Sequence, residues 1–400
     1  MLAGKHVVLG VSGSIAAYKA VYLTRLLVEA GADVWPILTQ SATRFVGPLT
    51  FSALTGHRVV TDMWSAAEAG EIGHVELAHR ASAFVLAPAT ADLIARLALG
   101  RADEPLGAVA LSTRAPWVVA PAMEEGMWLN PATQAHVATL VSRGARIVSP
   151  GSGPLASGRE GKGRLADPEQ IFEAILAALA PQDLAGHRLV VTAGPTREPF
   201  DPARFLSNAS SGKMGYALAR VARRRGAQVT LITGPTDLAP PPDVDLVRVT
   251  TTLDLLAACQ SAISGATALI MAAAPADFRP STPSPHKRKK TPGEHFSVDL
   301  ESNPDILRAL DARSRGLAVI GFAAESQDLA LNARKKLLDK NLDLVVANDI
   351  TAPGAGFAVD TNAVVLVSRD RDEPLPVMTK EAVAGAILDR LVILLGGRRS

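Results

Sequence analysis

The chain has 400 residues, which is more than one hydrophobic core usually serves, so two domains of roughly 150 to 200 residues are expected. With 48% hydrophobic and 20% charged residues, the composition is that of a globular protein and excludes extensive disorder. A formal net charge of +2 gives no field that argues for binding to nucleic acid or a membrane. A single cysteine, Cys259, rules out an internal disulfide framework, and the lack of a signal peptide or long apolar run favours the cytoplasm.

The first half begins with a β-branched strand, a Gly/Ser turn and a helix, in KHVVLGVSGSIAAYKAVYLTRLLVEAGADVWPILT, residues 5–39. Further buried strands are expected at 83–88, 117–122 and 146–150. Apolar strands that alternate with helices predict a parallel sheet with right-handed crossovers. The turn around Gly13 lacks the full G-x-G-x-x-G spacing and a Walker lysine, so it fits a phosphate cradle or a tight turn equally well.

Polar residues near these strands allow several interpretations. Thr90 and Asp92 open the helix of LAPATADLIARLALG, where helix capping is the plain explanation. His74, in EIGHVELAHR, precedes a helix and suits a core, surface or catalytic role. The stretch APAMEEGMW, residues 120–128, places Glu124 and Glu125 directly after a buried strand. Spacing alone assigns no chemistry to these side chains.

A glycine-rich segment, GSGPLASGREGKGRLADP at 151–168, follows the last of these strands. It has no apolar period and fits either a linker or a flap over a site. A helix and the linker PQDLAG, residues 181–186, come next. We therefore expect a first domain at 1–181 and a second at 186–400.

The second half repeats the strand, glycine loop and helix order in HRLVVTAGPTRE and SSGKMGYALARVARRRGAQVTLITG, and adds apolar strands at 268–274, 318–324 and 343–349. This indicates a second α/β domain with a parallel sheet. A cluster of hydrogen-bond donors follows its first strand: Arg197, Arg204, Asn208, Ser210, Ser211 and Lys213. Such a cluster suits an anionic substrate, although a solvated loop would also carry it.

Two basic segments of the second half also allow two interpretations each. KRKK, residues 287–290, lies in the proline-rich loop 278–296 and fits a solvated charge run or a loop that closes over a triphosphate. Lys336 and Lys340 are spaced i, i+4 on one helical face, as in a plain surface or a phosphate grip.

Taken together, these strings are specific. GVSGSIAAYK, LAPATADLIARLALG, TAGPTREPFDPARFLSNASSGKMG, KRKK, ESNPDIL, GFAAES and VANDI extend along nearly the whole chain. With them the sequence resembles the bifunctional phosphopantothenoylcysteine decarboxylase and phosphopantothenate-cysteine ligase family of coenzyme A biosynthesis. The resemblance implies a flavodoxin-like doubly wound first domain, a Rossmann-like α/β ligase domain, and a cytoplasmic homo-oligomer without nucleic-acid or membrane partners.

For the second domain, the resemblance implies a ligase that uses CTP and Mg²⁺ to join 4′-phosphopantothenate to cysteine through an acyl-cytidylate. Asn208 matches the amide that acts on the acyl-cytidylate, with Arg204 beside it. The positions that match nucleotide contacts are Asp277, Lys287, Pro304, Asp305, Ile306, Leu307, Phe322, Lys336 and Lys340. Pro275 stands where the family usually has valine, and no metal ligands are assigned.

For the first domain, the resemblance implies FMN bound between subunits and the decarboxylation of phosphopantothenoylcysteine to 4′-phosphopantetheine. His74 matches the catalytic histidine, and the Gly13 and Ser14 loop matches the phosphate contact. Thr39, Thr90 and Ser112 are further expected FMN contacts.

Two positions depart from the family pattern. Glu124 replaces a neutral amide that binds the substrate carboxylate, and Ser157 replaces the cysteine that donates a proton from the flap. Two carboxylates about 4 Å apart repel by roughly 4 kcal/mol at an effective dielectric near 20. We therefore expect an intact ligase beside a first domain that binds FMN and decarboxylates poorly. An oxidative decarboxylase and a non-catalytic FMN-binding scaffold are the alternatives.

Overall fold

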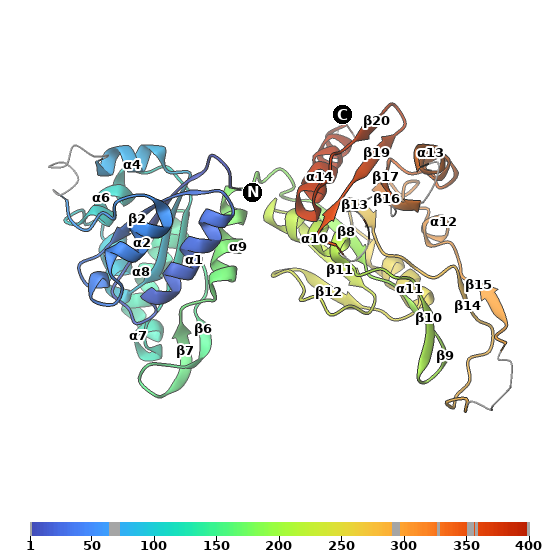
Figure 1. The fold of residues 1–400 in the computed structure, drawn as a ribbon, viewed down its shortest axis with the longest axis horizontal. Helices are drawn as coiled ribbons and strands as arrows, with labels where there is room; N and C mark the ends of the chain where they lie inside the picture. The colour runs from blue at the N-terminus through green and yellow to red at the C-terminus, as the bar shows by residue number, and fades with distance from the viewer. Residues whose placement is uncertain are drawn as a thin grey trace. The chain divides into compact units, whose positions relative to one another are not determined.

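The computed structural model describes residues 2–63, 73–289, 297–325, 329–349, 356 and 359–397. The chain separates into two compact units, Met1–Ala180 and Pro181–Ser400 (Figure 1). Within the described residues, every helix is too short or too polar to span a lipid bilayer.

The first unit contains a five-stranded parallel sheet in the order β2-β1-β3-β4-β5, which is the flavodoxin-like order. Its strands are β1 (His6–Val11), β2 (Asp33–Leu38), β3 (Ala83–Ala89), β4 (Trp117–Pro121) and β5 (Arg146–Ile147). Every residue of β3 is buried, as expected for a central strand that is covered on both faces. The predicted fold class of this domain is confirmed, although β5 is shorter than the predicted 146–150.

Helices cover both faces of this sheet because its strands alternate two apolar faces. Val7 and Leu9 of β1 pack with α1 (Ala17–Glu29), α2 (Pro48–Thr55) and α9 (Pro168–Leu179). Val8 packs on the opposite side with α4, α5, α6 and α8. These helices span His74–Arg80, Ala91–Ala98, Pro105–Ser112 and Pro131–Ser142. His74 was expected to precede a helix, whereas the structure makes it the first residue of α4.

The glycine-rich segment 151–168 forms an antiparallel hairpin of β6 (Gly151–Pro154) and β7 (Glu160–Arg164). The strand β7 lies against the short helix α7 (Glu125–Leu129) (Figure 1). The segment therefore forms regular strands, which its composition did not predict.

The second unit contains an eight-stranded sheet in the order β12-β11-β8-β13-β16-β17-β19-β20. The first six strands are parallel and follow the Rossmann order, whereas β19 and β20 are antiparallel. The expected Rossmann-like domain with a parallel sheet is confirmed, and β19 extends this sheet by pairing antiparallel with both β17 and β20. The strands are β8 (Arg188–Ala193), β11 (Gln228–Thr233), β12 (Asp245–Arg248), β13 (Ala268–Met271), β16 (Ala318–Glu325), β17 (Leu344–Asp349), β19 (Val364–Ser368) and β20 (Asp372–Pro374).

This sheet is also covered on both faces. Leu189 and Val191 of β8 pack with α10 (Lys213–Arg224) and α14 (Lys380–Gly396), and Val190 packs with the other helices. Those helices are α11 (Thr252–Ala262), α12 (Ile306–Leu310) and α13 (Leu329–Asp339). Three small ribbons complete the unit: β9 (Arg197–Asp201) with β10 (Arg204–Ser207), β14 (Phe278–Pro280) with β15 (Leu300–Ser302), and β18 (Thr361–Asn362) with β21 (Met378–Thr379).

Candidate functional sites

The first unit has a cavity of about 620 Å³ beyond the carboxyl ends of β1, β3 and β4. In a flavodoxin-like sheet the strand order reverses between β1 and β3, and ligands bind at this point. The flap closes one side of the cavity through Pro154, Leu155 and Ala156. Five residues singled out from the sequence line it: Gly13, Ser14, Thr90, Glu124 and Ser157.

The loop after β1 is held close to its neighbours. The Ser12 hydroxyl donates to the carbonyl of Pro88 at 2.7 Å and accepts a hydrogen bond from the N–H of Thr90 at 2.9 Å. A Cβ on Gly13 would lie 2.4 Å from Cβ of Ser41, so a larger residue does not fit there. The loops that follow β1 and β3 thus form one tightly packed edge of the cavity.

Glu124 and Glu125 connect the end of β4 to the flap. The Glu124 carboxylate accepts a hydrogen bond from the N–H of Gly126 at 2.5 Å and caps α7. The Glu125 carboxylate accepts one from the N–H of Lys162 at 2.8 Å. The N–H of Met123 donates to the carbonyl of Gly163 at 3.0 Å, and a Cβ on Gly163 would lie only 2.1 Å from the Met123 oxygen. The flap is therefore docked by backbone contacts that require glycine.

Sequence reasoning missed Lys19 as a cavity residue. Its side chain is 15% exposed, and its ammonium group donates to the carbonyl of Leu165 at 3.4 Å and to Asp167 at 3.2 Å. Lys19 thus joins α1 to the segment after the flap. The sequence did contain a sign of this role, because Lys19 is the last residue of GVSGSIAAYK and lies in the helix that follows the glycine loop.

Three predicted residues do not line this cavity. The Thr39 hydroxyl accepts a hydrogen bond from the N–H of Ala42 at 3.2 Å, and the Ser112 hydroxyl donates to the carbonyl of Ala108 at 2.9 Å. His74 begins α4, outside the residues that surround the cavity. The cavity of one chain is therefore lined without these three predicted residues.

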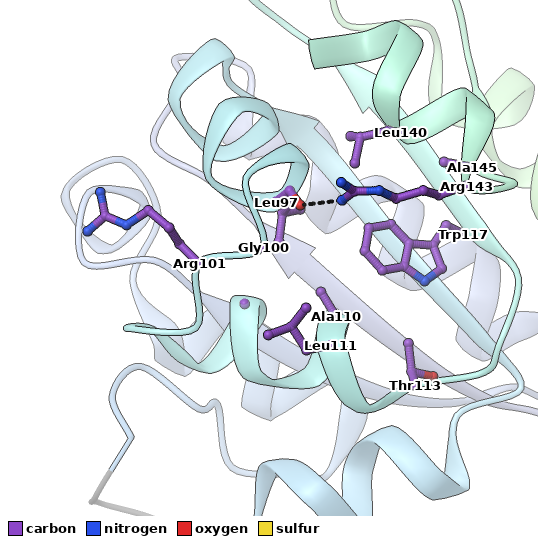
Figure 2. Close-up of a pocket in the computed structure, with 11 residues that line it drawn as sticks. Leu97, Gly100, Arg101, Ala110, Leu111, Thr113, Trp117, Leu140, Arg143 and Ala145 are labelled. Carbon is purple, nitrogen blue, oxygen red and sulfur yellow. Dashed lines mark hydrogen bonds between the residues drawn. The ribbon is translucent and has the colours of Figure 1, made fainter.

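A second cavity, of about 240 Å³, lies at the opposite end of β4, where Trp117 begins the strand. Figure 2 shows Trp117 and Leu140 among its apolar residues and the Arg143 guanidinium directed toward the carbonyl of Leu97, to which it donates at 3.4 Å. Leu111 and Thr113, the neighbours of Ser112, also line it. None of the residues predicted from the sequence borders this cavity.

In the second unit, several of the predicted nucleotide-binding residues contact one another or lie beside one another. The N–H of Asn303 donates to the carbonyl of Asp277 at 2.8 Å, which places the start of the 304–307 loop beside Asp277. Lys340 lies 3.0 Å from Asp305, and the Lys336 ammonium donates to the carbonyl of Phe322 at 2.6 Å. Lys336 thus contacts β16, and Lys340 contacts the 304–307 loop.

The side chains of the 304–307 loop have different surroundings. Ile306 is buried in the core, and Leu307 packs against the same cluster. Asp305 caps α12 by accepting a hydrogen bond from the N–H of Arg308 at 3.3 Å. Only the backbone of the two apolar residues is therefore placed to meet a ligand, while Asp305 is placed to orient Lys340.

The donor cluster after β8 is only partly assembled. Nδ2 of Asn208 donates to the carbonyls of Ala274 and Pro275, at 3.2 and 2.9 Å. Lys213 lies 2.6 Å from Asp360. Arg204 forms an ion pair with Asp201, a residue that sequence reasoning missed. Lys287 is exposed on the neighbouring loop, and Lys290 lies outside the described residues.

The chain matches two family models. Residues 1–180 match the family described as Flavoprotein, and residues 184–394 match the DNA/pantothenate metabolism flavoprotein C-terminal domain. The chain is 44% identical over 395 residues to the coenzyme A biosynthesis bifunctional protein CoaBC of Escherichia coli K12, covering 98% of this chain and 97% of that protein.

Proteins with the same name from two other bacteria are as similar. The Bacillus subtilis protein is 44% identical over 399 residues, covering 98% of each chain. The Mycobacterium bovis protein is 45% identical over 410 residues, covering 98% of this chain and 97% of its own. These matches confirm the resemblance inferred from the sequence strings, and the chain belongs to the family of coenzyme A biosynthesis bifunctional proteins.

Proposed function

We propose that the second unit is the CTP-dependent ligase that joins 4′-phosphopantothenate to cysteine. The substrate carboxylate attacks the α-phosphate of CTP, the bond to the β-phosphate breaks and pyrophosphate leaves. The cysteine amine then attacks the acyl carbon, loses a proton and displaces CMP. The observation that carries this proposal is that the lysines predicted to hold the triphosphate contact other predicted nucleotide residues, Lys340 with Asp305 and Lys336 with the Phe322 carbonyl.

The lysines of the proposed nucleotide site supply the positive charge that the first step needs. An anionic carboxylate and a triphosphate repel each other, so several cations are needed around them. Lys336, Lys340 and the loop lysine Lys287 supply such cations. Lys336 and Lys340 are oriented by the Phe322 carbonyl and by Asp305, respectively, so they are positioned before the nucleotide binds.

Asn208 fits the second step. Its Nδ2 is occupied by two carbonyls, while its Oδ1 accepts no hydrogen bond from the described residues. This oxygen is available to accept a hydrogen bond from the attacking cysteine amine.

Mg²⁺ is bound in such enzymes largely by substrate phosphates and water, with one or two carboxylates. The described part of the chain has no group of three or more His, Cys, Asp or Glu side chains that could hold a metal ion by itself. We therefore assign no step to a resident metal.

We further propose that the cavity of the first unit holds FMN. Its 620 Å³ are within the range of small-molecule sites, and its lining combines the polar Gly13 and Ser14 loop with apolar Ile15, Met123 and Met127. When bound, FMN supplies two-electron oxidation and reduction at the cysteinyl thiol. The protein supplies the phosphate contact, the apolar walls and the flap that excludes water.

Two cavity residues limit decarboxylation. Glu124 presents a carboxylate where the family amide would bind the carboxylate of the substrate. Ser157 is exposed on the flap, and an aliphatic alcohol donates a proton far less readily than a thiol with a pKa near 8.5. We infer that phosphopantothenoylcysteine is a poor substrate here. If only the flap acid is lost, the first unit would still release CO₂ and would form a product two hydrogens lighter than 4′-phosphopantetheine. If the first unit is a non-catalytic scaffold, it would bind FMN and release no CO₂.

The place of His74 supports a homo-oligomeric first unit. A catalytic histidine must reach the substrate, yet His74 does not line the cavity of its own chain. We therefore propose that a second copy of the chain brings His74 to this site.

The ligase is tested by measuring pyrophosphate release from CTP and Mg²⁺, with and without 4′-phosphopantothenate and cysteine. Release that requires 4′-phosphopantothenate is expected for the wild type. Asn208→Ala should still release pyrophosphate while forming little phosphopantothenoylcysteine. A wild-type protein that releases no pyrophosphate, or releases it equally without 4′-phosphopantothenate, would contradict the proposal.

A further inference from the structure

The β9–β10 hairpin carries a carboxylate that the proposed chemistry does not use. Asp201 ends β9, and its side chain is only 1% exposed. Oδ1 accepts hydrogen bonds from the N–H groups of Ala203 and Arg204, at 2.8 and 3.0 Å. Oδ2 accepts from Nε of Arg204 at 3.0 Å and from its terminal nitrogen at 2.5 Å. These four bonds close the hairpin turn.

A fifth bond leaves the hairpin. Oδ2 of Asp201 also accepts from the N–H of Arg288 at 3.2 Å, and the Arg204 guanidinium donates to the carbonyl of Arg288 at 2.9 Å. The ion pair therefore holds both backbone groups of one residue in the basic loop. A further bond, from the N–H of Ser284 to the carbonyl of Phe200 at 2.7 Å, joins the same two segments.

The contacts are of the strong kind. Hydrogen bonds with an ionised partner are about twice as strong as neutral ones, and a guanidinium pairs with a carboxylate in a fixed planar geometry. The hydrogen bond from Arg204, the N–H of Ala203 and the N–H of Arg288 hold the pKa of Asp201 well below its usual range, so the carboxylate stays ionised. Its charge also offsets the mutual repulsion of Lys287, Arg288 and Lys289, which are all exposed.

We propose that Asp201, through Arg204, clamps the backbone of Arg288 and so positions the adjacent Lys287 for the nucleotide triphosphate. This inference rests on the proposed ligase function and makes Asp201 a positioning residue. It also changes the predicted role of Arg204 from direct action on the acyl-cytidylate to holding the loop. A free loop would have to be ordered each time CTP binds, which lowers affinity for CTP.

The test compares the full-length Asp201→Asn protein with Asp299→Asn. Asp299 is exposed and directly precedes β15, and none of its side-chain atoms has a partner among the described residues. Asp201→Asn keeps the shape of the side chain but replaces one accepting oxygen with an NH₂ group, which would face the N–H donors that the carboxylate now binds. We expect a KM for CTP about tenfold higher, with kcat and the KM for 4′-phosphopantothenate nearly unchanged. A purely structural defect would change all three. Asp299→Asn should behave as the wild type.

A second measurement does not depend on activity. Trypsin cleaves after Lys and Arg, so a released loop is cut faster after residues 287–289, because cleavage follows the population of the open form. Asp201→Asn should raise this rate about tenfold without faster cleavage elsewhere. Arg204→Lys, at a side chain that is 43% exposed, keeps the charge and the cleavage site but loses the fork of donors, so it should act in the same direction if Asp201→Asn does not fold.

The outcomes are distinct. Faster loop cleavage together with a raised KM for CTP supports the clamp. Unchanged loop cleavage in both variants overturns it. If the wild type releases no pyrophosphate, the ligase proposal fails, and loop cleavage alone still decides whether the clamp exists.

Discussion

Asp305 and Lys340 join two separate parts of the proposed nucleotide site. Their side chains lie 3.0 Å apart, with Asp305 at the start of α12 and Lys340 directly after α13. Burial raises the pKa of Asp305, but the hydrogen bonds from Lys340 and the N–H of Arg308, together with both positive charges, lower it below its usual range overall. The 304–307 loop and the end of α13 are therefore held as one electrostatic unit.

Replacing Lys340 should weaken nucleotide binding. Lys340→Ala removes a proposed triphosphate cation and leaves Asp305 with Arg308, 3.8 Å away, as its remaining ion-pair partner. We expect the KM for CTP to rise about tenfold, equivalent to about 1.4 kcal/mol, in a pyrophosphate-release assay. Lys335→Ala, at an exposed lysine of the same helix, is the matched control and should leave this KM unchanged. Equal effects of both substitutions would argue against a specific site at Lys340.

A carboxylate in the first unit makes its stability depend on pH. Asp33 accepts hydrogen bonds from His57 at 2.5 Å, His6 at 2.8 Å and Trp35 at 2.9 Å. Burial raises the pKa of Asp33, but these bonds lower it below the ordinary 3.8 overall. A lowered folded pKa adds stability that is present above the unfolded value and is lost as pH falls through the folded value.

Asp33→Asn should therefore lower the urea midpoint of the first unit at pH 7, and the difference from the wild type should narrow as pH falls below 3.8. Urea titrations at several pH values test this. Glu29→Gln, which removes only an exposed ion pair with Arg25, should show almost no difference at any pH. A gap for Asp33→Asn that stays constant across this range would refute the assignment.

Cys259 should be chemically inert in the folded protein. It is fully buried in α11, and burial raises the pKa of its thiol to about 12, so almost no thiolate is present at pH 8. Iodoacetamide is expected to leave the native chain unmodified and to add one carbamidomethyl group after denaturation, as read by intact mass. Rapid labelling of the native chain would show that α11 opens readily.

Restoring the two family residues should raise decarboxylation. Glu124→Asn removes the repelling carboxylate, and Ser157→Cys supplies an acid that donates a proton to the decarboxylated carbon after CO₂ has left, a contribution of at least about a hundredfold. We expect the double variant to release CO₂ from phosphopantothenoylcysteine at least about a hundredfold faster than the wild type. The control is Glu124→Asn with Ser152→Cys, which places a thiol on the exposed strand β6 of the same flap. If both double variants behave alike, position 157 is not the proton donor.

Much of the architecture could be predicted because buried strands are visible in the sequence as short apolar runs. AFVLAP, WVVAP and LVVAND lie in β3, β4 and β17. The flap was not predicted as strands because GSGP and EGKGR have neither β-branched residues nor an apolar alternation. Its strands are held by backbone contacts with Met123 and by the Glu125 carboxylate, and such contacts leave no periodic pattern.

The antiparallel strands β19 and β20 were missed for a different reason. β19 begins only at Val364, well after the end of β17 at Asp349, and nothing in a short apolar run such as VVLVS specifies the direction of its neighbour. Prediction of the sites was limited in a similar way. The resemblance indicated which residues to inspect, whereas the ion pair of Asp201 with Arg204 and that of Asp305 with Lys340 depend on tertiary placement.

We expect an active ligase beside a first unit that scarcely decarboxylates phosphopantothenoylcysteine. Mass spectrometry of the products formed by the FMN-loaded protein from 4′-phosphopantothenate, cysteine, CTP and Mg²⁺ tests it most directly. Accumulation of phosphopantothenoylcysteine, with little further conversion, is the predicted result. Conversion to 4′-phosphopantetheine at an ordinary turnover of about 10 per second would contradict it and would make Glu124 and Ser157 competent catalytic residues.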